Sequence, residues 1–192
     1  MSKTLLIHVC CAPCAAPSLE TAEQDRWDQI ILFYSNSNIY PREEYDLRLR
    51  HVRRLAEIRQ LKLLEDRYDH ESWLDAVRGL EDEPEQGERC RKCFEYNLRR
   101  SAQAAARFAD CCFTTTLTVS PHKKSAAIFA IGQNWPEFAA YDFKKKDGFK
   151  RGMELCRQYG LYRQNYCGCE FSRHREKPDN LKIGGNNILQ VP

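Results

Sequence analysis

The sequence contains no long apolar stretch. No apolar run in the 192-residue chain approaches the roughly 18 residues that a membrane-spanning helix needs. The apolar part of the opening segment, MSKTLLIHVCCAPC, is too short for a secretory signal peptide, and cysteines follow it at once. We therefore expect a cytoplasmic protein that does not enter a membrane.

The chain also lacks a strong net charge. Its formal charge is +3, and this value alone singles out no partner. The charge is uneven, however, because residues 143–192 hold 11 lysines and arginines against 5 acidic residues. A basic quarter of this kind favours a polyanionic partner. A solvated basic surface without a partner is the alternative that charge alone leaves open.

Cysteine, in contrast, is abundant. The chain has 10 cysteines, at positions 10, 11, 14, 90, 93, 111, 112, 156, 167 and 169. A secreted disulfide scaffold is usually shorter, rich in loops and preceded by a signal peptide. A longer chain with periodic apolar patterning and no such signal favours metal ligands or redox-active thiols.

Short apolar runs alternate with amphipathic segments along the chain. The predicted strands are Thr4–Val9, Gln29–Tyr34, Leu61–Glu65 and Cys111–Val119. The predicted helices are Ala16–Asp25, Arg42–Gln60, Glu71–Leu80, a segment ending near Ala109, Ser120–Gly132 and Gly152–Tyr159. This alternation indicates a mainly parallel sheet flanked by helices. We expect a Rossmann-like, nucleotide-hydrolase-like α/β fold with a C-terminal cysteine-containing extension.

Chemically reactive residues follow the first and the last predicted strand. Cys10, Cys11 and Cys14 come just after the first strand, and His122 comes just after the last, behind the expected helix cap Ser120-Pro121. Ligands of parallel sheets bind outside the carboxyl ends of the strands. We therefore expect these residues to meet at one edge, where His122 is a candidate acid or metal ligand.

Two cysteine motifs have spacings that suit a metal. In Cys10-Cys11-x-x-Cys14, a turn after the strand would let both adjacent thiolates face one metal ion, whereas buried free cysteines are the alternative. The spacing Cys90-x-x-Cys93 recurs in zinc and iron–sulfur sites. Cys90 and Cys93 open a predicted helix, whose positive end favours thiolates.

The remaining cysteines divide into two groups. Cys167-Gly168-Cys169 would form a small, strained ring as a disulfide, which suits a labile catalytic bond, or the pair could complete a metal site. Cys111 and Cys112 start a predicted strand and Cys156 lies in a helical run, so we expect these three to serve packing.

A basic loop with aromatic neighbours, FKKKDGFKRG, occupies residues 143–152. Its basic side chains are candidates for phosphate contacts: Lys144, Lys145, Lys146, Lys150 and Arg151. The aromatic side chains that could stack on an unpaired base are Phe143, Phe149, Tyr159, Tyr162 and Tyr166. Packing in the core is the alternative role for each of these aromatics.

Taken together, the motifs resemble those of a known family. The segments in question are HVCCAPC at 8–14, CRKCF at 90–94, TTLTVSPHK at 115–123, FKKKDGFKRG at 143–152 and GLYRQNYCGCEFS at 160–172. In this order they resemble the epoxyqueuosine reductase QueH family over about residues 5–172. We expect a single catalytic domain at 1–172 that carries the iron–sulfur site, followed by a tail at 173–192.

The resemblance implies an activity. The family reduces the epoxide of epoxyqueuosine, in the wobble position of a tRNA anticodon, to the alkene of queuosine with loss of water and without cobalamin. It uses a [4Fe–4S] cluster, so the resemblance implies that tRNA and an unidentified electron donor are the partners of this chain.

The resemblance also implies roles for individual residues. The cluster ligands correspond to Cys10, Cys11, Cys90 and Cys93, and a redox-active disulfide corresponds to Cys167 and Cys169. An additional mononuclear iron is implied for part of the family, with Cys14 as the candidate ligand. Independently of the resemblance, the protons that this reduction consumes need a source, for which His122, Asp147 and Tyr166 are the candidates.

Three other functions compete with this interpretation. A zinc-binding nucleic-acid module would use Cys90 and Cys93 without catalysis, although Cys10-Cys11 is a poor zinc knuckle. A thiol–disulfide enzyme or iron–sulfur electron carrier would use Cys167 and Cys169 without contacting RNA. An ATP-dependent tRNA sulfurtransferase needs a glycine-rich phosphate loop after the first strand, where this chain has CCAPC.

Overall fold

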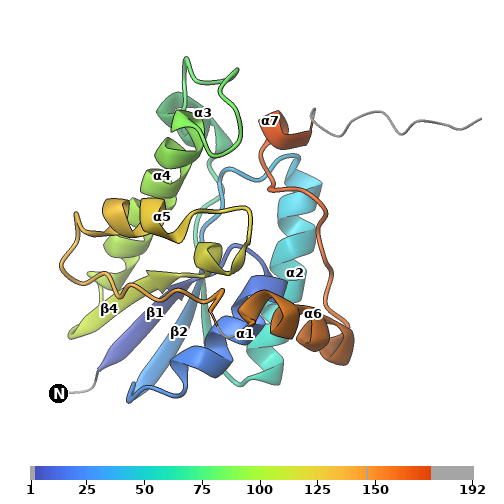
Figure 1. Ribbon diagram of the computed structural model, residues 1–192. Coiled ribbons are helices and arrows are strands. Elements are labelled where there is room, and N and C mark those ends of the chain that lie inside the picture. The colour runs from blue at the N-terminus through green and yellow to red at the C-terminus, as the bar shows by residue number, and fades with distance from the viewer. Residues whose placement is uncertain (1–2, 146, 174–192) are drawn as a thin grey trace, which may run out of the picture.

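Four parallel strands form the centre of the computed structural model, which describes residues 3–145 and 147–173. The strands are β1 (Thr4–His8), β2 (Gln29–Tyr34), β3 (Lys62–Glu65) and β4 (Cys111–Thr115). They lie in the order β3-β2-β1-β4, and each neighbouring pair is parallel. The expected α/β fold is thereby confirmed (Figure 1).

Helices cover both faces of this sheet. The helices of the described residues are α1 (Ala12–Ala22), α2 (Arg42–Ile58), α3 (His70–Ala76), α4 (Glu88–Ala105), the 3-10 helix η1 (Thr116–Val119), α5 (Ser125–Gly132), α6 (Gly148–Tyr159) and α7 (Glu170–Arg173). Figure 1 shows α1, α2 and α6 on one side of the sheet and α4 and α5 on the other.

The apolar strands explain this layering. Successive side chains of a strand point to opposite faces of the sheet. Leu5 and Ile7 of β1 therefore pack in the core under α1, α2 and α6, whereas Leu6 packs in the core under α4 and α5. All three are fully buried, as expected for a parallel strand covered on both faces.

The last strand is shorter than predicted. The sequence predicted a strand over Cys111–Val119, but β4 ends at Thr115 and residues 116–119 form η1. The Thr115 side chain accepts a hydrogen bond from the Leu117 backbone N–H, which caps this turn. The β-branched residues that favoured a strand are instead buried in a tight turn at the edge of the sheet.

Several predicted helix boundaries were also wrong. α1 begins at Ala12 rather than Ala16, because Pro13 fits the first helical turn and Cys11 is the extended N-cap residue. The predicted cap Ser120-Pro121 lies in a turn before α5, whose N-cap is Lys124. α6 begins at Gly148, four residues before the predicted start.

Other boundaries differ less. α2 ends at Ile58 rather than Gln60, α3 spans His70–Ala76 rather than Glu71–Leu80, and α4 ends at Ala105 rather than near Ala109. The packing roles predicted for Cys111 and Cys156 agree with their burial in β4 and α6, while Cys112 is half-buried. Within the described residues, no helix is long and apolar enough to cross a membrane. The predicted tail lies, from residue 174 on, outside the described residues.

The segment after α6 returns across α2 before it reaches α7. The Tyr162 backbone N–H donates a hydrogen bond to His51 Nδ1 on α2, at 3.1 Å. Further along, Phe171 of α7 packs with Cys169 against Trp73 of α3. The C-terminal cysteine segment is therefore fixed to the body of the protein at both of its ends.

His51 gives this attachment a pH dependence. Burial, together with Arg54 and Arg50, lowers the pKa of His51 below its usual 6.5, and its Nδ1 must be unprotonated to accept the bond from Tyr162. Below about pH 6.5 the unfolded chain therefore binds a proton that the folded chain does not bind. The stability that His51 contributes is present above this pH and is lost as the pH falls.

We predict that the difference in unfolding free energy between wild type and His51→Gln shrinks as the pH falls below 6.5. The glutamine does not titrate, so the change of this free-energy difference with pH comes from His51 alone. It amounts to no more than about 1.4 kcal/mol per pH unit. Urea unfolding between pH 7.5 and pH 5 measures it. A difference that stays constant over this range would contradict the attachment.

Candidate active site

The candidate site lies at the carboxyl ends of β1 and β4, where the order in which the chain adds strands to the sheet reverses. The chain crosses from β1 to β2 on one side and later places β4 on the other side of β1. The loops that leave the carboxyl ends of β1 and β4 therefore separate, and such a switch point is where ligands bind. A cavity of about 620 Å³ lies at this place. Six cysteines line it: Cys10, Cys14, Cys90, Cys93, Cys167 and Cys169.

Cys10, Cys11 and Cys14 form a compact group of thiols at the start of α1. Their three Sγ atoms lie within 4.8 Å of one another, and those of Cys10 and Cys11 are 3.8 Å apart. The chain bends from β1 into α1 at this point, and the bend brings the two adjacent side chains together. The thiols of Cys10 and Cys11 therefore lie close enough to bind one metal ion, as expected. The thiol of Cys14 joins them from the first turn of α1.

The thiols of this group compete for negative charge. Hydrogen bonds from Cys10 and Cys14 hold the pKa of Cys11 well below its usual value, with further help from Gln164 and Arg48. The bond with Cys11 raises the pKa of Cys10 to about 11, although the bond with Cys14 lowers it, and the bonds with Cys10 and Cys11 raise the pKa of Cys14 well above its usual value. The group thus holds one thiolate easily and resists more, unless a cation compensates the added charge.

Cys90 and Cys93 reach the cavity from the first turns of α4. Cys90 Sγ accepts a hydrogen bond from the Gln86 backbone N–H at 3.3 Å. Burial raises the pKa of Cys90 and raises that of Cys93 well above its usual value. The positive end of α4 opposes this effect of burial, because it favours negative charge on thiols at the helix start.

Cys167 and Cys169 line the cavity from the segment between α6 and α7. Both are free thiols in the structure; Cys167 is exposed and Cys169 is buried. Gly168 between them adopts a φ of +128°, which side chains rarely tolerate. An added Cβ would also lie 3.1 Å from both Arg48 and Ile39. The positive φ and the close neighbours together explain why a glycine occupies this position.

Arg48 of α2 holds this cysteine segment in place. Its buried guanidinium donates hydrogen bonds to the backbone carbonyls of Cys167 and Tyr166, at 3.1 and 3.3 Å. The same group forms an ion pair with Glu44 at 2.7 Å, with 3% of the Arg48 side chain exposed. A buried charge that is both paired and hydrogen-bonded fixes geometry, so the position of the Cys167 backbone is set by α2.

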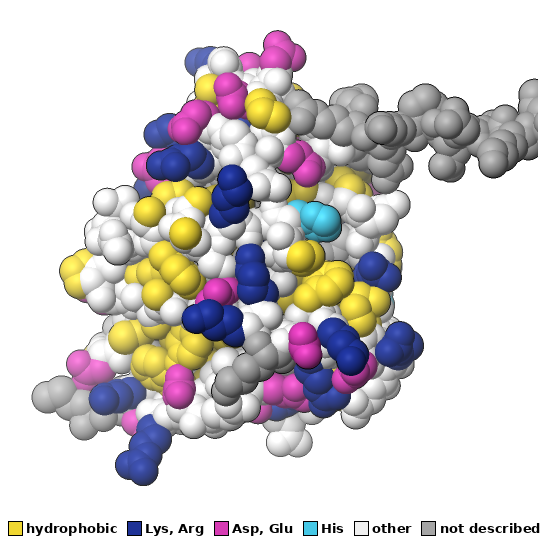
Figure 2. Space-filling model, viewed as in Figure 1, with side chains coloured by type: hydrophobic (Ala, Val, Ile, Leu, Met, Phe, Trp, Pro, Cys, Tyr) yellow, Lys and Arg dark blue, Asp and Glu magenta, His cyan; other side chains and the backbone are white. Residues whose placement is uncertain are grey.

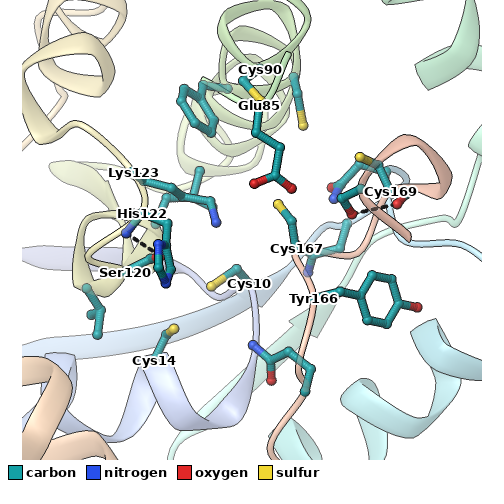
Figure 3. A pocket seen from close by; sticks show the side chains of 18 of the residues that line it. Cys10, Cys14, Glu85, Cys90, Ser120, His122, Lys123, Tyr166, Cys167 and Cys169 are labelled. Atoms are coloured by element: carbon teal, nitrogen blue, oxygen red, sulfur yellow. Dashed lines mark hydrogen bonds between the residues drawn. The ribbon is translucent and has the colours of Figure 1, made fainter. Parts of the chain in front are cut away.

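Two charged residues in the cavity had no predicted role. Lys123 is half-buried, and Figure 3 shows it across the cavity from Cys167. Burial lowers the pKa of Lys123, but its closeness to Cys167 and Cys10 outweighs burial and raises this pKa. Glu85 points its carboxylate toward Cys167 (Figure 3). Lys123 lies inside the motif TTLTVSPHK, whereas Glu85 lies in a polar loop with no sequence signal.

The three candidate proton sources lie in different places. His122 lines the cavity and is exposed. Tyr166 also lines it, but its hydroxyl donates to the Tyr40 carbonyl at 2.9 Å and its ring points away from Cys10 and Cys167 (Figure 3). Asp147 is an exposed residue before α6 and is not among the residues that line the cavity.

The basic loop is only partly available for a ligand. Lys145 and Lys150 are exposed, and Lys144 donates to the Lys123 carbonyl. Arg151 is paired with Glu20 at 2.7 Å and with Glu154 at 3.1 Å. Lys146 lies outside the described residues. Figure 2 shows basic side chains interleaved with acidic ones on this face, rather than one continuous basic patch.

The aromatic side chains of this region are also divided. Phe143 is buried and stacks on Tyr141, which places it in the core. Phe149 is 44% exposed and lines the cavity. Of the two phenylalanines of the loop, Phe149 is therefore the one placed to meet a ligand.

Comparisons with known proteins agree on one family. The family model described as epoxyqueuosine reductase QueH matches residues 5–175. A protein named epoxyqueuosine reductase QueH from Streptococcus pyogenes serotype M1 is 37% identical, over 98% of this chain and 74% of that protein. Proteins of the same name from Acinetobacter baylyi and Thermotoga maritima are 34% and 38% identical. These matches cover 94% and 91% of this chain and 88% and 93% of those proteins.

Proposed function

This chain belongs to the epoxyqueuosine reductase QueH family, whose members are oxidoreductases, and from this premise we propose that it reduces epoxyqueuosine in tRNA to queuosine. The observation that carries the proposal is the meeting of six cysteines from three distant parts of the chain in one cavity. This cavity lies at the switch point of the sheet, where a substrate of such a fold binds.

The thiols of the cavity suit a [4Fe–4S] cluster. We propose Cys10, Cys11, Cys90 and Cys93 as its ligands. Cys10, Cys90 and Cys93 line the cavity, and Cys11 Sγ lies 3.8 Å from Cys10 Sγ. Four thiolates at the starts of two helices are a fitting donor set for a cubane. Cys14 remains as the candidate ligand of an additional iron, because its Sγ completes the compact group.

A bound cluster supplies single electrons, and an additional iron supplies a Lewis acid for oxygen. The reaction needs two electrons and two protons for each epoxide, which becomes an alkene and water. We propose that the thiols of Cys167 and Cys169 provide the two electrons. Formation of a disulfide from two thiols releases two electrons and two protons, and the strain of so small a ring makes the disulfide easy to reduce again. A cellular electron donor then reduces the disulfide back to the two thiols.

His122 is the proposed proton donor to the departing oxygen. It is the candidate that faces the cavity, because Tyr166 directs its hydroxyl to a backbone carbonyl and Asp147 is not among the lining residues. Lys123 holds a positive charge beside the thiols and would stabilise negative charge on the same oxygen.

The tRNA partner is proposed to approach over α6. Lys145 and Lys150 are exposed, and they flank in sequence Phe149, which lines the cavity. Phosphate contacts by lysines and stacking of an unpaired base on an aromatic ring are the usual means of reading an RNA loop. Lys144, Lys146 and Arg151 remain weaker candidates for phosphate contact. Lys144 and Arg151 are occupied by protein groups, and Lys146 is outside the described residues.

We predict that Cys167→Ser and Cys169→Ser abolish single-turnover reduction of epoxyqueuosine tRNA. Pre-reduced wild type, freed of excess reductant, should form about one product per chain, because one dithiol supplies two electrons. Cys112→Ser is the matched control, since Cys112 lies in β4 outside the cavity. Undiminished product formation by both cavity variants would contradict the proposed dithiol.

We predict that His122→Gln lowers the single-turnover rate by about 10²-fold or more, the usual contribution of a positioned acid. Its tRNA affinity and iron content should match those of wild type. Rapid-quench assays on reduced protein measure the rate. An unchanged rate would remove His122 as the proton donor and return attention to Tyr166 and Asp147.

We predict that the double variant Lys145→Gln, Lys150→Gln binds tRNA more weakly than wild type. The slope of log affinity against log salt should fall in magnitude by about two, one for each lost phosphate contact. Filter binding over a salt series measures this slope. Lys62→Gln is the control, because Lys62 lies at the start of β3, on the sheet edge opposite β4. This variant should leave the slope unchanged. Equal slopes in all three proteins would contradict the proposed approach of tRNA over α6.

A further inference from the structure

Each of the four sulfur atoms proposed to hold the cluster accepts at least one hydrogen bond from a nitrogen or a hydroxyl. The donors are Thr116 for Cys10, Gln164 for Cys11, the Gln86 backbone for Cys90 and Asn97 for Cys93. Cys14 receives no such bond within residues 3–145 and 147–173. The proposed function does not explain why the four proposed ligand sulfurs receive these hydrogen bonds and Cys14 does not.

From this arrangement we infer that Thr116, Gln164 and Asn97 set the reduction potential of the iron–sulfur centre. The inference rests on the proposed function, because it takes the cluster ligands from it. It adds three side chains that are not ligands of the iron and that act through the ligand sulfurs.

Thr116 is the most firmly placed of the three donors. It is fully buried in the first position of η1. Its Oγ1 accepts a hydrogen bond from the Cys10 backbone N–H at 3.1 Å and lies 3.2 Å from Cys10 Sγ. Because the N–H occupies the oxygen as an acceptor, the hydroxyl proton is directed toward the sulfur. The pairing of His8 with Thr115 in neighbouring strands fixes the distance.

Gln164 and Asn97 donate from other parts of the fold. Gln164 Nε2 lies 3.0 Å from Cys11 Sγ. Asn97 Nδ2 lies 3.8 Å from Cys93 Sγ, one helical turn earlier on α4, and 3.3 Å from Asn38 Oδ1. The amide oxygens of Gln164 and Asn97 are buried without a hydrogen-bond partner among the described residues.

A buried amide oxygen without a partner is destabilising, so these side chains are poor choices for packing alone. Their N–H groups nevertheless reach sulfur. Hydrogen bonds to ionised groups are roughly twice as strong as those between neutral groups. The donor bonds therefore become stronger as negative charge on the ligand sulfurs increases.

This dependence on charge gives the donors their effect. Adding an electron to a cluster increases the negative charge on its sulfurs, and hydrogen bonds to those sulfurs favour the reduced form. The four bonds together hold the potential at a more positive value than the thiolates alone would give. Cys90 receives its bond from the backbone, which no side-chain substitution removes. Thr116, Gln164 and Asn97 are open to test.

The test is the midpoint potential of anaerobically prepared, cluster-loaded protein, followed by its visible spectrum in a redox titration. The variants are Thr116→Val, Gln164→Met and Asn97→Leu, which remove the donors and keep similar volumes. We expect a more negative potential in each, a larger shift in a double variant, and iron and sulfide contents equal to those of wild type. Thr116→Ser, which keeps the hydroxyl, should restore the wild-type potential.

Thr118→Val is the matched control. Thr118 is buried in the same η1 segment, but its hydroxyl donates to the Tyr141 carbonyl at 2.9 Å instead of a sulfur. The control should keep the wild-type potential. Loaded donor variants with the wild-type potential would overturn the inference. Loss of the cluster in all three donor variants, with retention in Thr118→Val, would also overturn the inference. That result would mean that the donors serve assembly of the cluster and not its potential.

The outcomes also separate this inference from the proposed function. If wild type itself holds no iron and sulfide, the proposed function fails before any potential is measured. If wild type is loaded and active but the three variants have unshifted potentials, the proposed function stands and the inference fails. If one variant does not hold the cluster, the other two still decide the result.

Discussion

The pairing of β1 with β4 is the constraint on which the rest of the structure depends. His8 at the end of β1 faces Thr115 at the end of β4, and the buried His8 ring bonds both Thr115 Oγ1 and the Ser35 carbonyl, each at 2.9 Å. This contact ties the carboxyl ends of three strands together. Cys10 and Thr116 leave the sheet directly beyond it, so their contact follows from the register of the strands.

The chemistry of the cavity follows from crowding thiols against this edge. Thiols that approach so closely cannot all ionise without a compensating charge, and the opposite shifts in the pKa of Cys11 and Cys14 express this. The starts of α1 and α4, and the Lys123 ammonium, supply positive potential. A bound metal centre would satisfy the same thiols more completely. The fold thus gathers sulfur where positive potential is already present.

Local sequence patterns predicted much of this fold and of the site. The apolar runs marked all four strands, and the motifs marked the cysteines that line the cavity. Contacts between distant segments were beyond such patterns. Arg48 holds Cys167 across 119 residues of chain, and nothing near Arg48 in the sequence indicates it. The early start of α1, which brings Cys14 beside Cys10, depends on a bend that the spacing of apolar residues does not record.

The central claim is that these thiols hold an iron–sulfur centre. The most direct measurement is the content of iron, acid-labile sulfide and zinc in protein purified without oxygen. We predict about four irons and four sulfides per chain, and a brown absorption that bleaches on reduction. A fifth iron would point to the site at Cys14. Zinc without sulfide would contradict the account and favour a zinc-binding nucleic-acid module.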